Sequence, residues 1–183
     1  MENGFNFFRI KTEWTAERTD GGLAKTKTEE LVYASSYTEA ERVAYEIAET
    51  QSRMRFNSSI NLEITKTKIG EILFNLTLCT DSNLIAGLVH NYFKEGDDTG
   101  VGLYGVKVMY IELDEKTGGE KRSNDTIFTP AASNTDAANY VKQYLKEYET
   151  RDFVIRDTKF DKAEAILWSS DIHQEKVRLS EQF

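Results

Sequence analysis

The sequence lacks several features that mark particular classes of protein. Its single cysteine, Cys79, allows neither an internal disulfide nor a cysteine-based zinc site. Its apolar runs are only a few residues long, as at 72–74, whereas a membrane-spanning helix needs about 20 apolar residues. The first residues contain no basic stretch followed by an apolar one, so we expect no secretory signal. These absences favour a cytoplasmic protein of a bacterium or a phage-infected cell, with no membrane partner.

The charge balance is acidic and evenly spread. The chain has 23 lysines and arginines against 31 aspartates and glutamates, a net charge of −8, and no basic block. Long-range attraction to duplex DNA or to an anionic membrane is therefore disfavoured, although a local basic groove is compatible with this total. Apolar residues make up 39% and charged residues 30% of the chain, which is typical of a soluble globular protein.

The chain instead contains a weak internal repeat. Residues 8–14 align with 104–110, a Gly-Gly turn at 21–22 falls close to another at 118–119, and residues 36–40 align with 133–137. In each copy an alternating strand, a glycine-containing turn and a second strand predict a hairpin. A helical stretch follows, and two further strands are predicted after it.

The helix of each copy has the same signals. Ser36 or Thr38 in the first copy, and Ser133 or Thr135 in the second, can cap the free N–H groups of a helix. Behind the caps, apolar residues recur at helical spacing and predict one buried stripe per helix. The two stripes are Ala40, Val43, Ala44, Ile47 and Ala48, and Ala137, Tyr140, Val141, Tyr144 and Leu145.

We therefore predict an α+β protein of two tandem, pseudo-symmetric β-β-α-β-β units with antiparallel sheets and one helix per unit. The units span residues 5–78 and 103–168. A connecting segment, 79–102, includes apolar residues between 84 and 93 that predict a short helix, followed by a mobile stretch at 95–102. Residues 169–183 form a polar C-terminal tail that docks on its own domain or on a neighbour.

Two stretches resemble a known family. Residues 107–122, KVMYIELDEKTGGEKR, resemble the second-half signature of a family of small Bacteroidetes proteins described only as a domain of unknown function. Residues 31–42, LVYASSYTEAER, are similar to its first half. The resemblance implies a bacterial or phage cytosolic origin, but it implies no activity and no catalytic residues. Segment 79–102 is longer than the connection usual in that family.

Motifs of enzymes and cofactor sites have plainer explanations here. The G-x-G-x-x-G pattern at 100–105 opens a predicted strand rather than a helix, so it reads as a flexible entry to the second unit. Asp171, His173 and Glu175 alternate and could hold a metal on one face of a strand, but such a pattern arises often by chance in an exposed tail. Cys79 is expected to be buried as a small apolar residue. We predict no enzyme, no catalytic, cofactor or metal site, and no bound cofactor.

Aromatic residues are frequent, at 11%, and some of them lie beside cations on the predicted strands. Aromatic rings can stack on unpaired bases while neighbouring cations follow the phosphates, although the same rings can equally build the core. The candidate nucleic-acid or anion contacts are Arg9, Lys11, Trp14, Lys107 and Tyr110.

The function that this sequence favours is that of a non-enzymatic binding or assembly protein. Exposed strand edges would pair with a protein partner or with another copy of the chain, as a homo-oligomer. Leu179 and Phe183 in the tail are candidate partner contacts. One alternative is a single-stranded nucleic-acid-binding protein, with a phage as one source. Another is the capture of a small anionic ligand, such as a nucleotide, between the two halves by Lys11 and Lys107.

Overall fold

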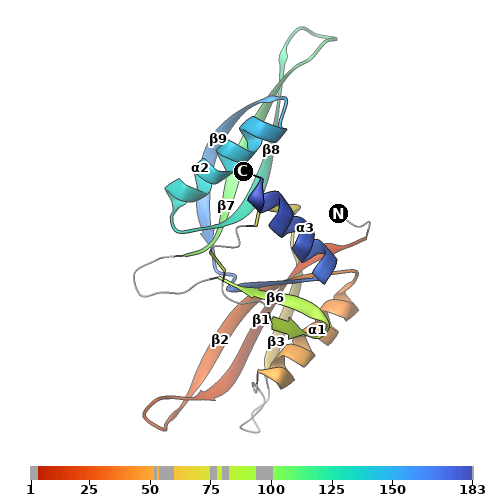
Figure 1. Cartoon of the computed structure of the whole chain (residues 1–183). Coiled ribbons are helices and arrows are strands. Elements are labelled where there is room, and N and C mark those ends of the chain that lie inside the picture. Colours follow the sequence, from red (N-terminus) through yellow and green to blue (C-terminus); the bar gives the residue numbers. More distant parts are fainter. Residues whose placement is uncertain are drawn as a thin grey trace. The chain divides into compact units, whose positions relative to one another are not determined.

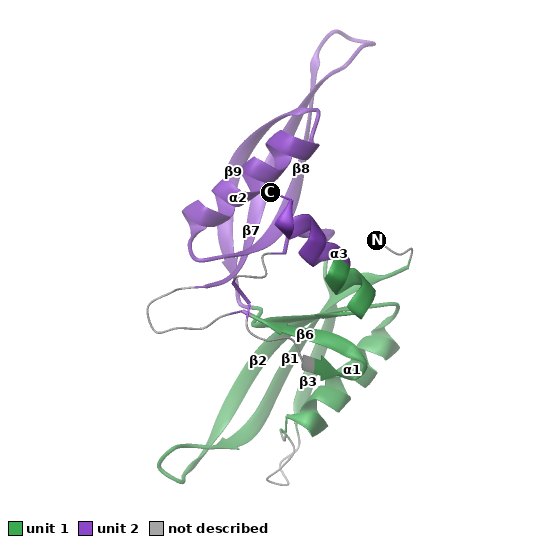
Figure 2. Cartoon of the chain, viewed as in Figure 1, with its two compact units in different colours: residues 1–68, 80–92, 163–174 green, residues 69–79, 93–162, 175–183 purple. Residues whose placement is uncertain are grey.

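The computed structural model describes residues 4–51, 53, 60–74, 78–79, 83–93 and 101–182. These residues form an α+β protein that consists mostly of sheet, with three helices in the described part. The chain divides into two compact units, which Figure 2 distinguishes by colour. The first unit takes residues 1–68, 80–92 and 163–174, and the second takes 69–79, 93–162 and 175–183.

The first unit is built on a six-stranded sheet (Figure 1). The strand order across this sheet is β3-β1-β2-β10-β6-β5, and α1 packs against one face. The elements are β1 (Asn6–Glu17), β2 (Leu23–Ala34), α1 (Tyr37–Thr50), β3 (Asn61–Lys66), β5 (Asn83–Ile85), β6 (Leu88–Tyr92) and β10 (Ala165–Trp168).

The second unit is built on a four-stranded sheet in the order β4-β8-β7-β9, and α2 packs against it. Its elements are β4 (Glu71–Ile72), β7 (Gly102–Leu113), β8 (Glu120–Ala131), α2 (Asn134–Tyr148) and β9 (Asp152–Asp161). A third helix, α3 (Ser170–Glu181), ends the described chain. None of the described helices is both long enough and apolar enough to cross a membrane.

Both predicted hairpins are confirmed. β1 pairs antiparallel with β2 from Asn6 opposite Ala34 to Glu17 opposite Leu23. β7 pairs with β8 in the same way, from Gly102 opposite Ala131 to Leu113 opposite Glu120. The turns require glycine at Gly21 and Gly118, because these residues adopt φ angles of 85° and 72° that residues with a side chain disfavour.

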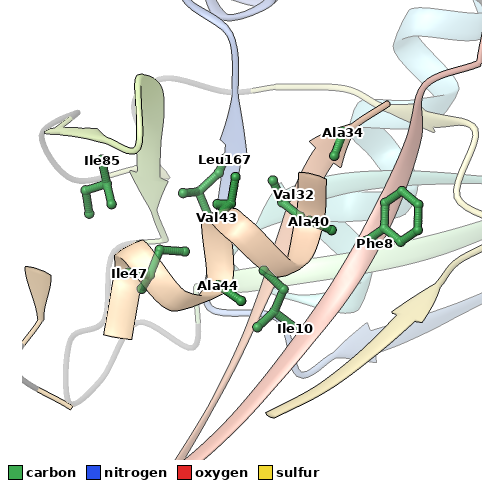
Figure 3. Packing of buried hydrophobic residues seen from close by; sticks show 10 residues of the cluster. All are labelled: Phe8, Ile10, Val32, Ala34, Ala40, Val43, Ala44, Ile47, Ile85 and Leu167. Carbon is green, nitrogen blue, oxygen red and sulfur yellow. The ribbon is translucent and has the colours of Figure 1, made fainter. Parts of the chain in front are cut away.

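Both predicted helices are also confirmed, with equivalent caps. The hydroxyl of Ser36 accepts a hydrogen bond from the backbone N–H of Glu39 at 3.1 Å, and Ser133 accepts one from Asp136 at the same distance. The stripe of α1 packs on Phe8, Ile10 and Val32, as Figure 3 shows. In α2, the small and aliphatic residues of the stripe are buried, whereas Tyr140 and Tyr144 are only partly buried at its margin.

The last strand of each sequence repeat joins the sheet of the other unit. β4 runs parallel to β8 with Ile72 beside Phe128, and β10 runs parallel to β2 with Ile166 beside Leu31. Both parallel pairings place an Ile-Leu-aromatic segment next to equivalent positions of the two hairpins, which lie 97 residues apart. The elements occur in the same order in both repeats. The compact units differ from the repeats at these two strands, because β4 of the first repeat lies in the second unit and β10 of the second repeat lies in the first.

The prediction of a helix between residues 84 and 93 is wrong. These residues form the hairpin of β5 and β6, and Ala86 and Gly87 have positive φ angles of 56° and 77°. Positive φ at both central residues is the geometry of a two-residue hairpin turn, which a helix cannot contain. Leu84, Ile85, Leu88 and Val89 have a spacing that fits a helix, but here they flank a turn. The mobile stretch predicted at 95–102 lies outside the described residues up to position 100.

Candidate functional site

The alternation of β1 and β7 places the predicted contact residues on opposite faces of their sheets. Side chains of neighbouring strand residues point to opposite faces. In the first unit the face under α1 carries Phe8, Ile10 and Trp14, so Arg9 and Lys11 lie on the other face. In the second unit Tyr110 lies on the face under α2 and Lys107 on the other. We call the face away from the helix the outer face of each sheet. Within each sheet, the candidate cations and the candidate ring therefore lie on opposite faces.

An arginine covers each of the two candidate stacking rings. The guanidinium carbon of Arg53 lies 4.7 Å from the centroid of the Trp14 ring, and that of Arg151 lies 4.0 Å from the Tyr110 ring. Both arginines are the third residue after their helix, and both rings occupy the same position of the hairpin. A cation above an aromatic ring is a favourable contact in its own right, so these rings have a structural role at the helix end.

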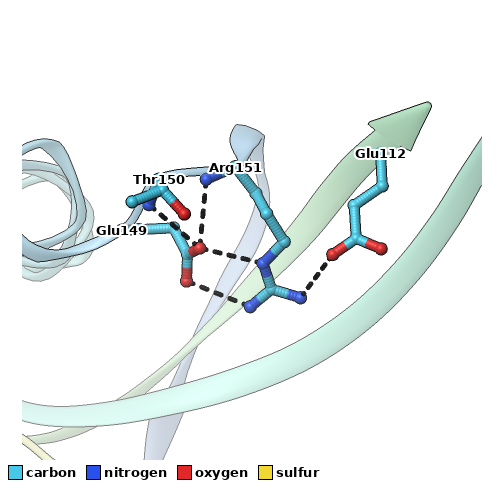
Figure 4. Close-up of polar contacts among 4 residues, drawn as sticks. All are labelled: Glu112, Glu149, Thr150 and Arg151. Carbon is cyan, nitrogen blue, oxygen red and sulfur yellow. Dashed lines mark hydrogen bonds and ion pairs between the residues drawn. The ribbon is translucent and has the colours of Figure 1, made fainter.

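The two arginines form salt bridges with different carboxylates. Arg53 donates from Nη1 to the Glu30 carboxylate at 2.7 Å, and the two side chains are only 6% and 1% exposed. Arg151 lies at the surface and binds both Glu149 oxygens at 2.9 and 3.0 Å, with Glu112 at 3.4 Å (Figure 4). The bonds from Arg151 lower the pKa of Glu149 to about 2. This network fixes the turn that leads from α2 into β9.

Glu30 is the centre of a buried polar cluster that sequence analysis did not identify. It accepts a bond from the Thr28 hydroxyl at 3.1 Å, and its second oxygen is 4.0 Å from Nε2 of His90. His90 is fully buried, and desolvation together with the charge of Arg53 lowers its pKa to about 4. Thr12 lies on the same face with a buried hydroxyl. One sequence signal exists, because Glu30 alternates with Val32 on the apolar face of β2. Its partners are distant in sequence.

On the outer face of the first sheet, basic and acidic side chains of neighbouring strands lie next to one another. Lys11 stands between Glu29 on β2 and Glu63 on β3. Arg9 pairs with Glu29 at 3.2 Å, and Glu13 pairs with Lys25 and Lys27 at 3.4 and 3.6 Å. A depression of about 140 Å³ between these side chains is small for any ligand beyond a few atoms. Opposite charges already adjoin the cation that we considered for anion binding.

The outer face of the second sheet carries a larger depression around Lys107. Its volume is about 370 Å³, and its lining comes from β7, β8 and β9. The lining residues are Gly105, Lys107, Thr126, Phe128, Asp157, Lys159, Phe160 and Asp161. The Phe128 ring lies against Gly105, since a Cβ at this position would lie only 2.9 Å from Cε1 of Phe128. The depression therefore exists where β7 has no side chain.

β9 is the outermost strand of the second sheet. It pairs with β7 on one side, and it stands last in the strand order of the described sheet. Two of its ten residues, Val154 and Phe160, are large apolar residues that are 42% and 59% exposed. A long strand with an unpaired edge and exposed apolar side chains is a surface that another strand can join.

The two candidate contacts in the tail have different outcomes. Leu179 lies in α3 and is half-buried, whereas Phe183 lies outside the described residues. The second half of α3 is held within the second unit, since Lys176 donates to Glu71 at 2.8 Å and Tyr148 donates to Gln182 at 3.3 Å. The tail thus docks at least partly on its own chain.

The remaining sequence motifs lie in α3, at Cys79 and at the start of β7. Residues 171–175 belong to a helix rather than a strand, so Asp171, His173 and Glu175 do not share one face in the way a metal site would need. In the described part of the chain no three histidine, cysteine, aspartate or glutamate side chains are grouped to hold a metal ion. Cys79 is buried, as predicted, and Gly102 and Gly105 lie within a strand.

Comparison with known proteins identifies the family. Residues 6–168 match the family described as Domain of unknown function (DUF4494), and the chain belongs to this family. No curated protein and no solved structure matches the chain.

Proposed function

We propose that this member of the family is a non-enzymatic binding or assembly protein that acts through strand pairing at the edge of β9. The observation that carries the proposal is the ten-residue edge strand with two exposed apolar side chains. Natural proteins usually shorten, cover or charge such an edge, because it otherwise recruits other strands. β9 does carry charged residues and a bulge opposite Lys107 and Val108, but it is neither short nor covered in the described sheet. We infer that its length serves pairing with a partner.

The pseudo-symmetric repeat supports the same reading. We propose that the two halves derive from one β-β-α-β-β unit and that only the second half keeps an edge suited to a partner. The corresponding edge strand of the first unit, β3, has six residues against ten in β9, although both strands pack two apolar side chains on their cores. The greater length of β9 supports the proposal that binding belongs to the second half.

Single-stranded nucleic acid and a small anionic ligand are less well supported. Trp14 and Tyr110 lie on the opposite faces from Arg9, Lys11 and Lys107, and an arginine already covers each ring. Base stacking and phosphate contacts would therefore need different faces of one sheet. Lys11 stands between two glutamates, which disfavours an anion at that position.

The proposal is tested by selecting binders from a displayed library of short random peptides. The wild-type chain is compared with a variant in which Val154→Lys and Phe160→Lys place charges on the edge. A matched control carries Leu23→Lys and Tyr45→Lys, because these residues are 54% and 51% exposed and belong to the first unit. We expect peptides that bind the wild type and the control but not the edge variant.

Self-association is measured in parallel by sedimentation at increasing protein concentration. A dimer that the edge variant abolishes would assign the same edge to homo-oligomer formation. A chain that stays monomeric and enriches no peptide, or enriches the same peptides after the edge is charged, would contradict the proposal.

A further inference from the structure

The outer face of β9 has an ordered charge pattern. Asp157, Lys159 and Asp161 are spaced by two residues, so their side chains share the outer face in the order negative, positive, negative. All three line the depression of about 370 Å³. A strand that pairs with β9 would place its own side chains directly opposite these three, about 5 Å away.

The centre of the pattern is cationic and lies next to a gap. Lys159 is opposite Gly105 on β7, and Lys107 is the next outer-face residue along β7. Among the described residues neither lysine forms an ion pair, in contrast to Arg9 or Lys25 of the first unit. The ring of Phe128 lies over Gly105 and gives the gap an apolar floor. The two lysines thus flank a floor that the Phe128 ring covers.

The flanking carboxylates limit what can enter this gap. Asp157 lies directly opposite Lys107, and its Oδ1 accepts a bond from the backbone N–H of Thr158 at 2.9 Å. A chain of phosphates would meet Asp157 and Asp161 on either side of the lysines. A single carboxylate flanked by cations two residues away meets an opposite charge at each position.

We propose that the partner strand of β9 carries the pattern basic–x–acidic–x–basic and that its acidic side chain pairs with Lys159, at the margin of the depression that Lys107 also lines. This inference rests on the proposed function, since it names the chemistry of the strand that pairs with the edge. The pattern reads the same in both directions, so it holds for parallel and antiparallel pairing. The glutamate lies directly opposite Lys159 at about 5 Å, whereas Lys107 on β7 is two strand spacings away, about 10 Å, and adds only a longer-range attraction.

The sequence of the chain itself does not contain this pattern. No position has a basic residue, an acidic residue two positions later and another basic residue two positions after that. The charge complement of Asp157–Asp161 is therefore sought on a different protein rather than on a second copy of the chain.

The test is titration calorimetry of the full chain with short synthetic peptides. The first peptide has Lys–Val–Glu–Val–Lys at its centre, the second has Glu–Val–Lys–Val–Glu, and the third is the first with alternate backbone nitrogens methylated. We expect the charge-reversed peptide to bind at least about tenfold more weakly, because three cross-strand pairs become repulsive. Backbone methylation removes the ladder hydrogen bonds and should abolish binding.

Variants of the chain locate the contact. Lys159→Glu should weaken the first peptide about tenfold, and replacing the peptide's central glutamate with lysine should restore binding to this variant. Lys107→Gln should weaken it about two- to fivefold. Lys121→Glu, an exposed lysine on β8 outside the depression, is the matched control and should leave binding unchanged.

The outcomes separate the two proposals. Equal binding of both charge patterns that remains sensitive to backbone methylation would overturn the pattern but leave strand pairing at β9 intact. Failure of every peptide to bind, or binding that ignores methylation, would overturn both. A dimer of the chain that Lys159→Glu dissociates and that excludes the peptide would show that a second copy is the occupant.

Discussion

The two units use the same scaffold but place their polar residues differently. In the first unit the arginine after the helix turns inward to Glu30, and the charges of the outer face pair with one another. In the second unit the equivalent arginine stays at the surface with Glu149, and the outer face keeps Lys107 and Lys159 without ion pairs among the described residues. The two halves thus use equivalent positions differently: the first pairs its polar groups with one another, and the second leaves cations on the outer face that our proposal assigns to recognition.

The largest difference should appear when the two carboxylates that hold these arginines are neutralised. Glu30→Gln leaves Arg53 buried without its anion, and we expect the free energy of unfolding to fall by about 3–5 kcal/mol. Glu149→Gln removes a partner that is partly open to solvent and should have a much smaller effect. Both tryptophans, Trp14 and Trp168, belong to the first unit, so denaturant unfolding followed by tryptophan fluorescence measures Glu30→Gln, and amide hydrogen exchange in β9 measures Glu149→Gln in the second unit.

A control for that experiment replaces the whole pair. If Glu30→Leu and Arg53→Met together restore most of the stability that Glu30→Gln removes, the loss comes from an unpaired buried charge. A loss from Glu149→Gln as large as that from Glu30→Gln would contradict the contrast between the units.

Acid should destabilise the first unit through His90. Its pKa in the folded chain, about 4, lies below the value of about 6.5 expected when unfolded, so the unfolded chain takes up a proton first as the pH falls. Stability from this group is therefore present above pH 6.5 and is lost between about pH 6.5 and 4, by roughly 3 kcal/mol in total. Unfolding free energies at pH 7 and pH 4.5 measure this loss.

The comparison residue for the acid effect is His173. Burial also lowers its pKa, but it lies half-buried on α3. We expect His90→Gln to remove most of the difference between the two pH values, while His173→Gln keeps it. An unchanged pH dependence in His90→Gln would show that the cluster around Glu30 is not its source.

The helix caps should behave alike, because the units share them. Ser36→Ala and Ser133→Ala each remove one side-chain acceptor at 3.1 Å, and each should cost about 1 kcal/mol. Hydrogen exchange of the amides in α1 and α2 measures the loss of stability of each helix in the variant that carries both substitutions. A loss confined to one helix would mean that the repeat does not extend to the energetics of its caps.

The smallest effect is expected on the outer face of the first sheet. Glu13→Gln removes the exposed pairs with Lys25 and Lys27 and should lower stability by only about 0.2–0.5 kcal/mol, less at high salt. The check is to measure the free energy of unfolding in 1 M salt, where the wild type and the variant should have the same value. A loss above about 1 kcal/mol that persists in salt would show that this face has more than a solvated lattice of charges.

Much of the local structure could be predicted because its signals are local. Alternation, turn glycines and capping serines specified both hairpins and both helices within a few residues. The β5–β6 hairpin was missed because Leu84, Ile85, Leu88 and Val89 satisfy a helical spacing as well as two short strands. The turn at Ala86-Gly87 was the signal that could have decided between them.

The site was harder to predict because its geometry depends on distant residues. The last strands of the repeats each pair with the other hairpin, and no local pattern determines which parallel neighbour Ile72 or Ile166 chooses. Lys107 was singled out from the sequence, whereas its neighbour Lys159 became visible only through the register of β9 against β7. Glu30 on β2, His90 on β6 and Arg53 after α1 meet from distant parts of the sequence and could not have been grouped from sequence.

We propose that a partner strand pairs with β9 and not with the edge of the first unit. Amide hydrogen exchange of the wild-type chain with and without the Lys–Val–Glu–Val–Lys peptide, read separately for β9 and β3, tests this directly. We expect slower exchange at alternate residues of 152–161 and no change at 61–66. Protection at β3, or no protection of either edge at saturating peptide, would contradict the proposal.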